Sequence, residues 1–122
     1  MTIDEIFEKS SFFDTKDLIS IKKNGVVFTK RDICDTIIYE VKPNINDIIC
    51  EPSVGKGIFI FSLFEYFKNN GINIKSIAQF VNNRLFCYDI NIDFINEFKY
   101  LLNEYFLLNN YVDELELNNI IV

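Results

Sequence analysis

The residues of this chain best suited to chemistry are acids, a serine and glycines that follow two apolar runs. They are Glu51, Ser53, Gly55, Gly57 and Asp89. Glu51 ends one apolar run and leads through a glycine loop into an apolar helix, and Asp89 ends a second run. In open α/β sheets, ligands bind in the crevice at the carboxyl ends of the strands. This order of strand, loop and helix therefore predicts a pocket for a nucleotide-like cofactor.

The glycine loop fails two common nucleotide motifs at specific residues. A dinucleotide fingerprint needs a third glycine or an alanine where this chain has Ile60. A phosphate-binding P-loop needs Ser or Thr after Gly-Lys, but Lys56 is followed by Gly57. The acids indicate another ligand, because Asp89 could accept both hydroxyl groups of a ribose and Glu51 could pair with an amine. An amine and a ribose without a diphosphate describe S-adenosylmethionine.

Each feature of this pattern also has a plainer interpretation. A Gly-x-Gly sequence is more often an ordinary turn than a binding site, and Asp89 could equally be the N-cap of the helix that follows it. Glu51 alone indicates nothing. Their combination in the order strand, loop and helix favours the cofactor.

Apolar periodicity predicts an alternating series of helices and strands. The expected helices are Ile3 to Ser10, Lys30 to Val41, Ile58 to Asn69 and Ile92 to Leu107, and the expected strands are Asp47 to Cys50, Arg84 to Tyr88 and a third beginning near Asn118. Residues 72–83 are ambiguous between an irregular connection and a short helix. In the second helix, Ile33, Ile37, Ile38 and Val41 are predicted to face the core. The alternation is typical of a parallel α/β sheet.

Composition excludes several classes of protein. The net charge of −6 argues that this chain does not supply the main nucleic-acid-binding surface, which would be basic. The absence of histidine argues against a Cys/His metal site. Cys34, Cys50 and Cys87 lie far apart among apolar neighbours, so buried thiols in a reducing compartment are expected. The acidic start lacks the features of a signal peptide, and no apolar run approaches the roughly 20 residues of a membrane span. A cytoplasmic protein is expected.

Three segments in order resemble the adenine-specific (N6) DNA methyltransferases of bacterial restriction–modification systems. Gly25 to Lys30 is similar to the family's Gly-x-x-Phe/Tyr-Thr-Pro motif, with lysine in place of proline, and Glu51 to Phe59 is similar to Asp/Glu-Pro-Ser/Ala-x-Gly-x-Gly-x-Phe. Phe86 to Ile90 is similar to the second-strand motif. The resemblance implies the N-terminal half of a Rossmann-like S-adenosylmethionine-dependent methyltransferase fold, with parallel strands 1 to 3. Residues 1–24 would then be a helical and polar extension, and residues 25–122 a partial cofactor-binding domain.

The resemblance also implies roles for individual residues toward S-adenosylmethionine. Thr29 would contact the methionine carboxylate, and Glu51 would serve the amino group directly or through water. Ser53, Gly55 and Gly57 would form the floor of the site.

The remaining roles concern the nucleoside and the missing chemistry. Asp89 would hold the ribose, with Ile90 beside the adenine. The family's catalytic motif, Asn/Asp-Pro-Pro-Tyr/Phe, does not occur in this chain, so no catalytic residue is expected. DNA would be the substrate only through a complementary catalytic and recognition chain. A non-catalytic cofactor-binding or interaction module is the alternative.

The resemblance also implies an exposed edge of the sheet at the first strand. In the family's sheet that strand is central, between the second and the fourth. In this chain alone, Ile48 to Cys50 would become an exposed apolar edge, which invites pairing with another polypeptide.

Overall fold

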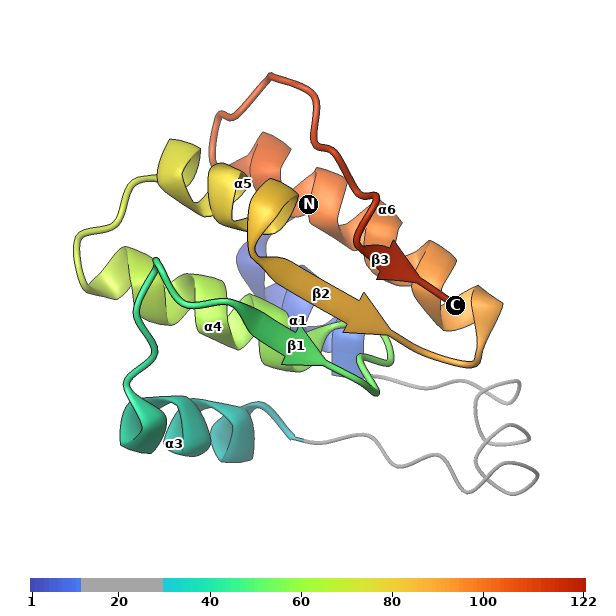
Figure 1. The fold of residues 1–122 in the computed structure, drawn as a ribbon, viewed down its shortest axis with the longest axis horizontal. Coiled ribbons are helices and arrows are strands. Elements are labelled where there is room, and N and C mark those ends of the chain that lie inside the picture. Colours follow the sequence, from blue (N-terminus) through green and yellow to red (C-terminus); the bar gives the residue numbers. More distant parts are fainter. Residues whose placement is uncertain (12–29) are drawn as a thin grey trace.

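The computed structural model describes residues 1–11 and 30–122 of the chain. The elements are α1 (Ile3–Ser11), α3 (Arg31–Val41), β1 (Ile49–Glu51), α4 (Ile58–Asn69), α5 (Ile74–Asn83), β2 (Leu85–Tyr88), α6 (Ile92–Leu108) and β3 (Ile120–Ile121). From β1 onward helices separate the strands, as the apolar pattern predicted, with α4 and α5 between β1 and β2 and α6 between β2 and β3 (Figure 1). The ambiguous segment at 72–83 proves to be mostly the helix α5. Its N-cap is Asn73, whose side chain accepts a hydrogen bond from the Ser76 N–H.

The three strands form one parallel sheet in the order β1-β2-β3. Ile49 is in register with Leu85, and Cys87 with Ile120. This α/β architecture is compatible with a Rossmann-like fold. Strand β1 pairs only with β2 among the described strands, so the expected edge position of the first strand is confirmed.

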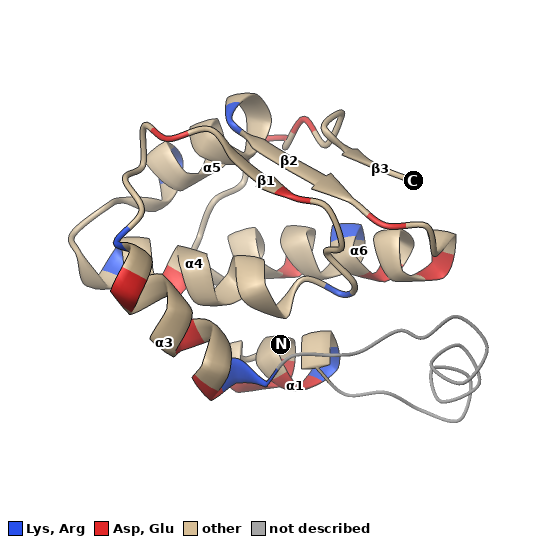
Figure 2. Cartoon of the chain, turned by 60° about the horizontal axis from the view of Figure 1, so that its bottom comes forward, with Lys and Arg blue, Asp and Glu red and all other residues tan. Residues whose placement is uncertain are grey.

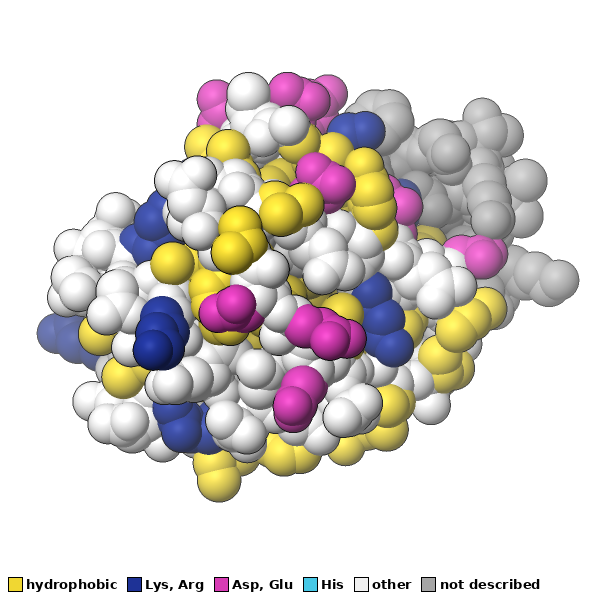
Figure 3. All heavy atoms as spheres, turned by 90° about the horizontal axis from the view of Figure 1, so that it is seen from above, with side chains coloured by type: hydrophobic (Ala, Val, Ile, Leu, Met, Phe, Trp, Pro, Cys, Tyr) yellow, Lys and Arg dark blue, Asp and Glu magenta, His cyan; other side chains and the backbone are white. Residues whose placement is uncertain are grey.

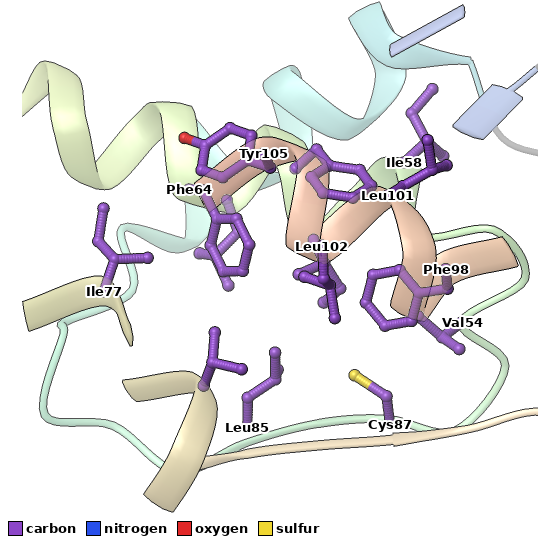
Figure 4. Packing of buried hydrophobic residues seen from close by; sticks show 14 of the residues in the cluster. Val54, Ile58, Phe64, Ile77, Leu85, Cys87, Phe98, Leu101, Leu102 and Tyr105 are labelled. Carbon is purple, nitrogen blue, oxygen red and sulfur yellow. The ribbon is translucent and has the colours of Figure 1, made fainter. Parts of the chain in front are cut away.

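The described helices cover one face of the sheet. Figures 1 and 2 place α4 and α6 against that face, with α1 and α3 in a further layer beyond them. Leu85 and Cys87 of β2 are buried and point toward α6 (Figure 4). On the opposite face Phe86 is half-buried and Ile121 is 45% exposed. Because parallel sheets are normally covered on both faces, an exposed apolar second face is unusual.

Aromatic rings from α4 and α6 fill the centre of the core. The packed rings include Phe61, Phe64, Phe98, Tyr105 and Phe106. The Tyr105 hydroxyl donates a hydrogen bond of 2.7 Å to Glu65 Oε2, which satisfies the one polar atom of that ring. Burial, and then the charge of Glu65, raise the pKa of Tyr105 well above its usual range. Helix α4 is covered on several sides, by α1, α3 and α5, as its apolar surface predicted.

Helix α1 belongs to the same core. Ile6 and Phe7 are buried in the cluster that includes α4 and α6, and the Arg31 guanidinium lies 3.5 Å from the centre of the Phe7 ring. This cation–π contact joins α1 to α3. The boundary expected after residue 24 lies outside the described residues.

The predicted core face of α3 is wrong in part. Ile38 is buried as expected, but Ile33, Ile37 and Val41 are 49%, 42% and 68% exposed. Cys34 is the other buried residue of this helix. Only positions 34 and 38 are buried where this helix packs on α4, while beside them Asp35 accepts a hydrogen bond from Ser62 and the Tyr39 ring meets that of Tyr66 edge to face. The side chains of Ile33, Ile37 and Val41 extend past that contact.

The expectation of three buried thiols is also wrong for one of them. Cys34 and Cys87 are buried, but Cys50 is exposed. In register with Phe86, Cys50 lies on the face of the sheet that no described helix covers. Its apolar neighbours in sequence belong to an edge strand and do not enclose it.

The molecular surface carries charges of both signs. Figure 3 shows acidic and basic side chains interspersed with hydrophobic ones on the face seen from above. Within residues 1–11 and 30–122, no helix has the length and apolar character that a membrane span requires.

The burial of the cysteines predicts selective thiol labelling. Burial, and then the nearby Asp35 carboxylate, raise the pKa of Cys34 to about 11, and burial raises the pKa of Cys87 still further. Both thiols stay protonated near pH 8.5 and are inaccessible, so we expect iodoacetamide to label only Cys50 in the native chain. Mass spectrometry should count one adduct natively and three in denaturant. A Cys50→Ser variant should show none natively, and adducts on Cys34 or Cys87 there would contradict the core packing.

Candidate functional site

The candidate site is the loop from Glu51 to Gly57, which connects β1 to α4 at the carboxyl edge of the sheet (Figure 1). Gly55 and Gly57 have φ angles of 58° and 96°, in the left-handed region that glycine adopts without strain. Gly57 is also the N-cap of α4, and its carbonyl accepts hydrogen bonds from Ile60 and Phe61. The two glycines thus reverse the chain and start the helix within a few residues of the strand.

Asp89, directly after β2, is bonded to this loop. Its Oδ2 accepts a hydrogen bond of 2.9 Å from the Gly55 N–H, and its Oδ1 accepts one of 2.9 Å from the Asn91 N–H. One carboxylate therefore joins the loops that follow β1 and β2. A carboxylate offers about four lone-pair positions, so capacity for further donors remains after these two bonds.

Glu51 is bonded in a similar local way. Its Oε1 accepts a hydrogen bond of 3.0 Å from the Ser53 N–H, which holds the side chain back over its own loop. The next amide, that of Val54, donates to the Tyr88 carbonyl at 2.9 Å. The loop is thus attached to the end of β2 by backbone as well as by Asp89.

Gly57 is required by the core. A Cβ atom at this position would overlap the ring of Phe98, a fully buried residue of α6. The Gly57 N–H already donates to the Val54 carbonyl at 3.0 Å. A glycine that the sequence assigned to close approach of a cofactor therefore has a packing reason of its own, and its contact with a cofactor stays a prediction.

The N-cap of α6 is Asn91, and not Asp89. The Asn91 side chain accepts hydrogen bonds from the amides of Asp93 and Phe94. Asp89 precedes this cap and supports it by accepting the Asn91 N–H. The alternative left open for Asp89 is thereby excluded, and its carboxylate points back to the glycine loop. The sequence offers Asn91, two residues before Asp93, as a signal for this helix start, although the cap was considered only at Asp89.

The structure brings most of the predicted cofactor residues to one edge. Glu51 and Ser53 are bonded to each other, and Gly55 is bonded to Asp89. Ile90 is 84% exposed next to Asp89 and is available for an apolar contact. Thr29 lies outside the described residues, and its predicted contact with the methionine carboxylate remains untested.

Two other features bear on what the site could hold. Among residues 1–11 and 30–122, no cluster of three or more His, Cys, Asp or Glu side chains could bind a metal ion. A cavity of about 480 Å³ lies between α3, β1 and α4, and reaches the loop only at Glu51. Glu51 is thus common to the cavity and the candidate site, and the other lining residues of the cavity lie outside the loop.

Comparison with known proteins identifies no relative: no family model matches the chain, and neither curated proteins nor solved structures give a significant match.

Replacing Gly57 by alanine should destabilise the fold through Phe98. We expect Gly57→Ala to lower the free energy of unfolding by about 2–4 kcal/mol, since a left-handed φ and overlap with a buried ring both add cost. Gly71→Ala is the matched control, because Gly71 has a φ of 85° but nothing within 4 Å of its Cβ position. It should lose only about 1 kcal/mol in urea unfolding. Equal losses for the two variants would remove Phe98 from the explanation.

The bonds of Asp89 predict local protection of the loop. Asp89→Asn replaces one acceptor oxygen by a donor, so the amide of Gly55 or of Asn91 should lose its partner. We expect that amide to exchange with solvent about tenfold faster or more in NMR hydrogen exchange. The Gly57 amide, bonded to the Val54 carbonyl, is the internal control and should keep its rate. Unchanged protection at both Gly55 and Asn91 would show that the carboxylate does not organise the loop.

Proposed function

We propose that this chain is the S-adenosylmethionine-binding portion of a site-specific DNA adenine-N6 methyltransferase. The observation that carries the proposal is the bond between Asp89 and Gly55. It joins an acid at the end of one parallel strand to the glycine loop at the end of its neighbour. Such a carboxyl edge is where nucleotide-like cofactors bind in open α/β sheets.

The bonding pattern of the two acids supports a ligand with an amine and a diol. Asp89 uses its oxygens on the amides of Gly55 and Asn91 and keeps lone pairs for two ribose hydroxyl groups. Glu51 keeps acceptor capacity beyond the Ser53 amide for an ammonium group. Two acids at one edge do not favour a diphosphate, which would repel both. These properties support S-adenosylmethionine over a dinucleotide.

The other proposed contacts with the cofactor are assigned from where each residue lies along the carboxyl edge of the sheet. Ile90 offers an exposed apolar side chain to the adenine, while Ser53 and Gly55 provide the floor. Gly57 contributes by fixing the start of α4, since its own amide is already bonded. Thr29 is assigned to the methionine carboxylate by the resemblance alone.

Methyl transfer would need residues that this sequence does not contain. To methylate adenine in DNA, an enzyme must flip the base out of the duplex and orient its amino group against the sulfonium methyl. The two prolines of the chain, Pro43 and Pro52, are not adjacent, so no Asn-Pro-Pro-Tyr motif is present. The net charge of −6 also disfavours binding of the DNA phosphates by this chain alone. A complementary catalytic and recognition chain therefore forms part of the proposal.

The absence of that motif also favours the second candidate, a non-catalytic module that binds S-adenosylmethionine. The two candidates share the cofactor site and differ in the partner. Mixing the chain with a polypeptide that carries the catalytic motif and measuring methyl transfer to DNA separates them.

Cofactor binding is tested by calorimetry with S-adenosylmethionine. We expect weak but saturable binding, and a loss of about tenfold or more in affinity for Asp89→Ala, because the ribose acceptor and the loop contact are both removed. Glu114→Ala removes the same charge from an exposed position far along the chain and should bind like the parent. The dinucleotide NAD should not compete. Equal affinity for both variants would exclude Asp89 from the site, and preferential binding of NAD would contradict the proposed ligand.

A further inference from the structure

The groove beside β1 has the properties of a binding site for another polypeptide. Its cavity of about 480 Å³ is within the range of sites that bind ligands. Three apolar residues on its walls are unusually exposed: Ile37, Val41 and Ile48, at 42%, 68% and 75%. Phe59, Ile60 and Leu63 of α4 form the opposite wall. We call this surface, with the edge of β1, the β1 groove.

One wall of the β1 groove is strand backbone on the edge of β1 with which no other strand among residues 1–11 and 30–122 pairs. The Ile49 N–H donates to the Arg84 carbonyl at 2.9 Å, so Ile49 directs its peptide groups toward β2. Successive residues of a parallel strand direct these groups to opposite sides, and those of Cys50 therefore face the groove. A strand laid along this edge can bond to Cys50 while alternate side chains enter the cavity.

The length of that pairing is limited by Pro52. Pro52 is two residues after Cys50, so its peptide groups would face the same side, toward the groove. Proline has no N–H, and the hydrogen-bond donor at that position is therefore missing. Pairing can therefore use the backbone around Ile48 and Cys50 but cannot continue along the loop. The β1 groove fits a short extended segment.

The charges of the groove indicate the composition of that segment. Asp47 and Glu51 line it, and no Lys or Arg stands among its described lining residues. A basic residue on the bound segment would gain from both acids. A second copy of this chain would instead bring its own Asp47 and Glu51 to the same edge, where like charges repel.

We propose that the β1 groove binds a short extended segment of a different polypeptide, apolar at alternate positions and flanked by Lys or Arg. The segment adds a strand to β1 and fills the cavity between α3 and α4. This proposal stands whether or not the carboxyl edge binds a cofactor.

The first test uses the whole chain and a defined probe, the peptide acetyl-Lys-Val-Thr-Ile-Thr-Val-Lys-amide with a fluorescent label. We expect saturable binding by fluorescence polarisation. Two N-methylated versions, each blocked along one edge of the peptide, test the backbone pairing. One of them should bind about tenfold weaker or worse and the other should keep its affinity. If the unblocked peptide does not bind, or if neither blocked version differs from it, strand addition is wrong.

The second test places the peptide in the groove. Ile37→Asp puts a charge on the groove wall, whereas Ile33→Asp changes an equally exposed residue of the same helix that does not line the groove. We expect about a tenfold loss of peptide affinity for the first variant and none for the second, with circular dichroism unchanged in both. Equal effects of the two variants would place binding elsewhere.

The third test examines charge and self-association. A peptide with Glu in place of both Lys should bind several-fold weaker at low salt, and the difference should shrink in about 1 M salt. Light scattering of the chain alone identifies a competing second copy. The chain could prove to be a dimer that the Ile37→Asp substitution dissociates but that added peptide does not dissociate. That result would assign the groove to a second copy and overturn the proposal.

Discussion

Because the three strands are parallel, every loop that leaves a strand carboxyl end lies at the same edge of the sheet. Two loops far apart in sequence are therefore neighbours, and Asp89 bonds one to the other through Gly55 and Asn91. The backbone bond from Val54 to Tyr88 strengthens the same connection. The geometry of the candidate site depends on this junction, to which Lys56 adds a contact with the Phe94 ring at 5.8 Å from its centre.

The site is also tied to the core beneath it. Gly57 starts α4, and the ring of Phe98 lies against its backbone in the space that a Cβ atom would occupy. Figure 4 shows Phe98 among Val54, Leu102 and Cys87, the contacts that link the loop to α6 and β2. A change in packing around Phe98 would therefore move the glycine loop. A substitution that alters the core around Phe98 is thus expected to alter the candidate site as well.

Elements that are strongly and continuously buried are predictable from the apolar pattern of the sequence. The bounds of α4 and nearly those of α6 follow from their apolar residues. The edge position of β1 was expected only from the resemblance to a family whose first strand is central. The apolar pattern does not predict the exposure of α3, where Ile33, Ile37 and Val41 are as apolar as core residues but lie past the contact with α4. Periodicity identifies an apolar face and does not reveal how wide the neighbouring helix is. Periodicity was also uninformative for α5, whose buried residues form one short apolar run, Ile77, Ala78, Phe80 and Val81, interrupted only by Gln79.

The same limit applied to the candidate site. Residue order predicted that Glu51, Gly55 and Asp89 share an edge, because parallel strands require it. The bond of Asp89 to Gly55 and the clash at Gly57 could not be predicted, since both depend on side chains that meet only in three dimensions. Cys50 was misjudged because its neighbours in sequence are apolar, although none of the described helices covers its face.

Pro52 has a consequence for the colloidal behaviour of the protein. Stacking of chains into cross-β fibrils needs about six or seven consecutive residues with complete backbone pairing. The apolar run at β1 starts at Ile48 and meets a missing donor at Pro52, so it is too short for that. An edge this apolar would otherwise be a hazard in a concentrated solution. The proline permits a finite, short pairing and blocks its unlimited repetition.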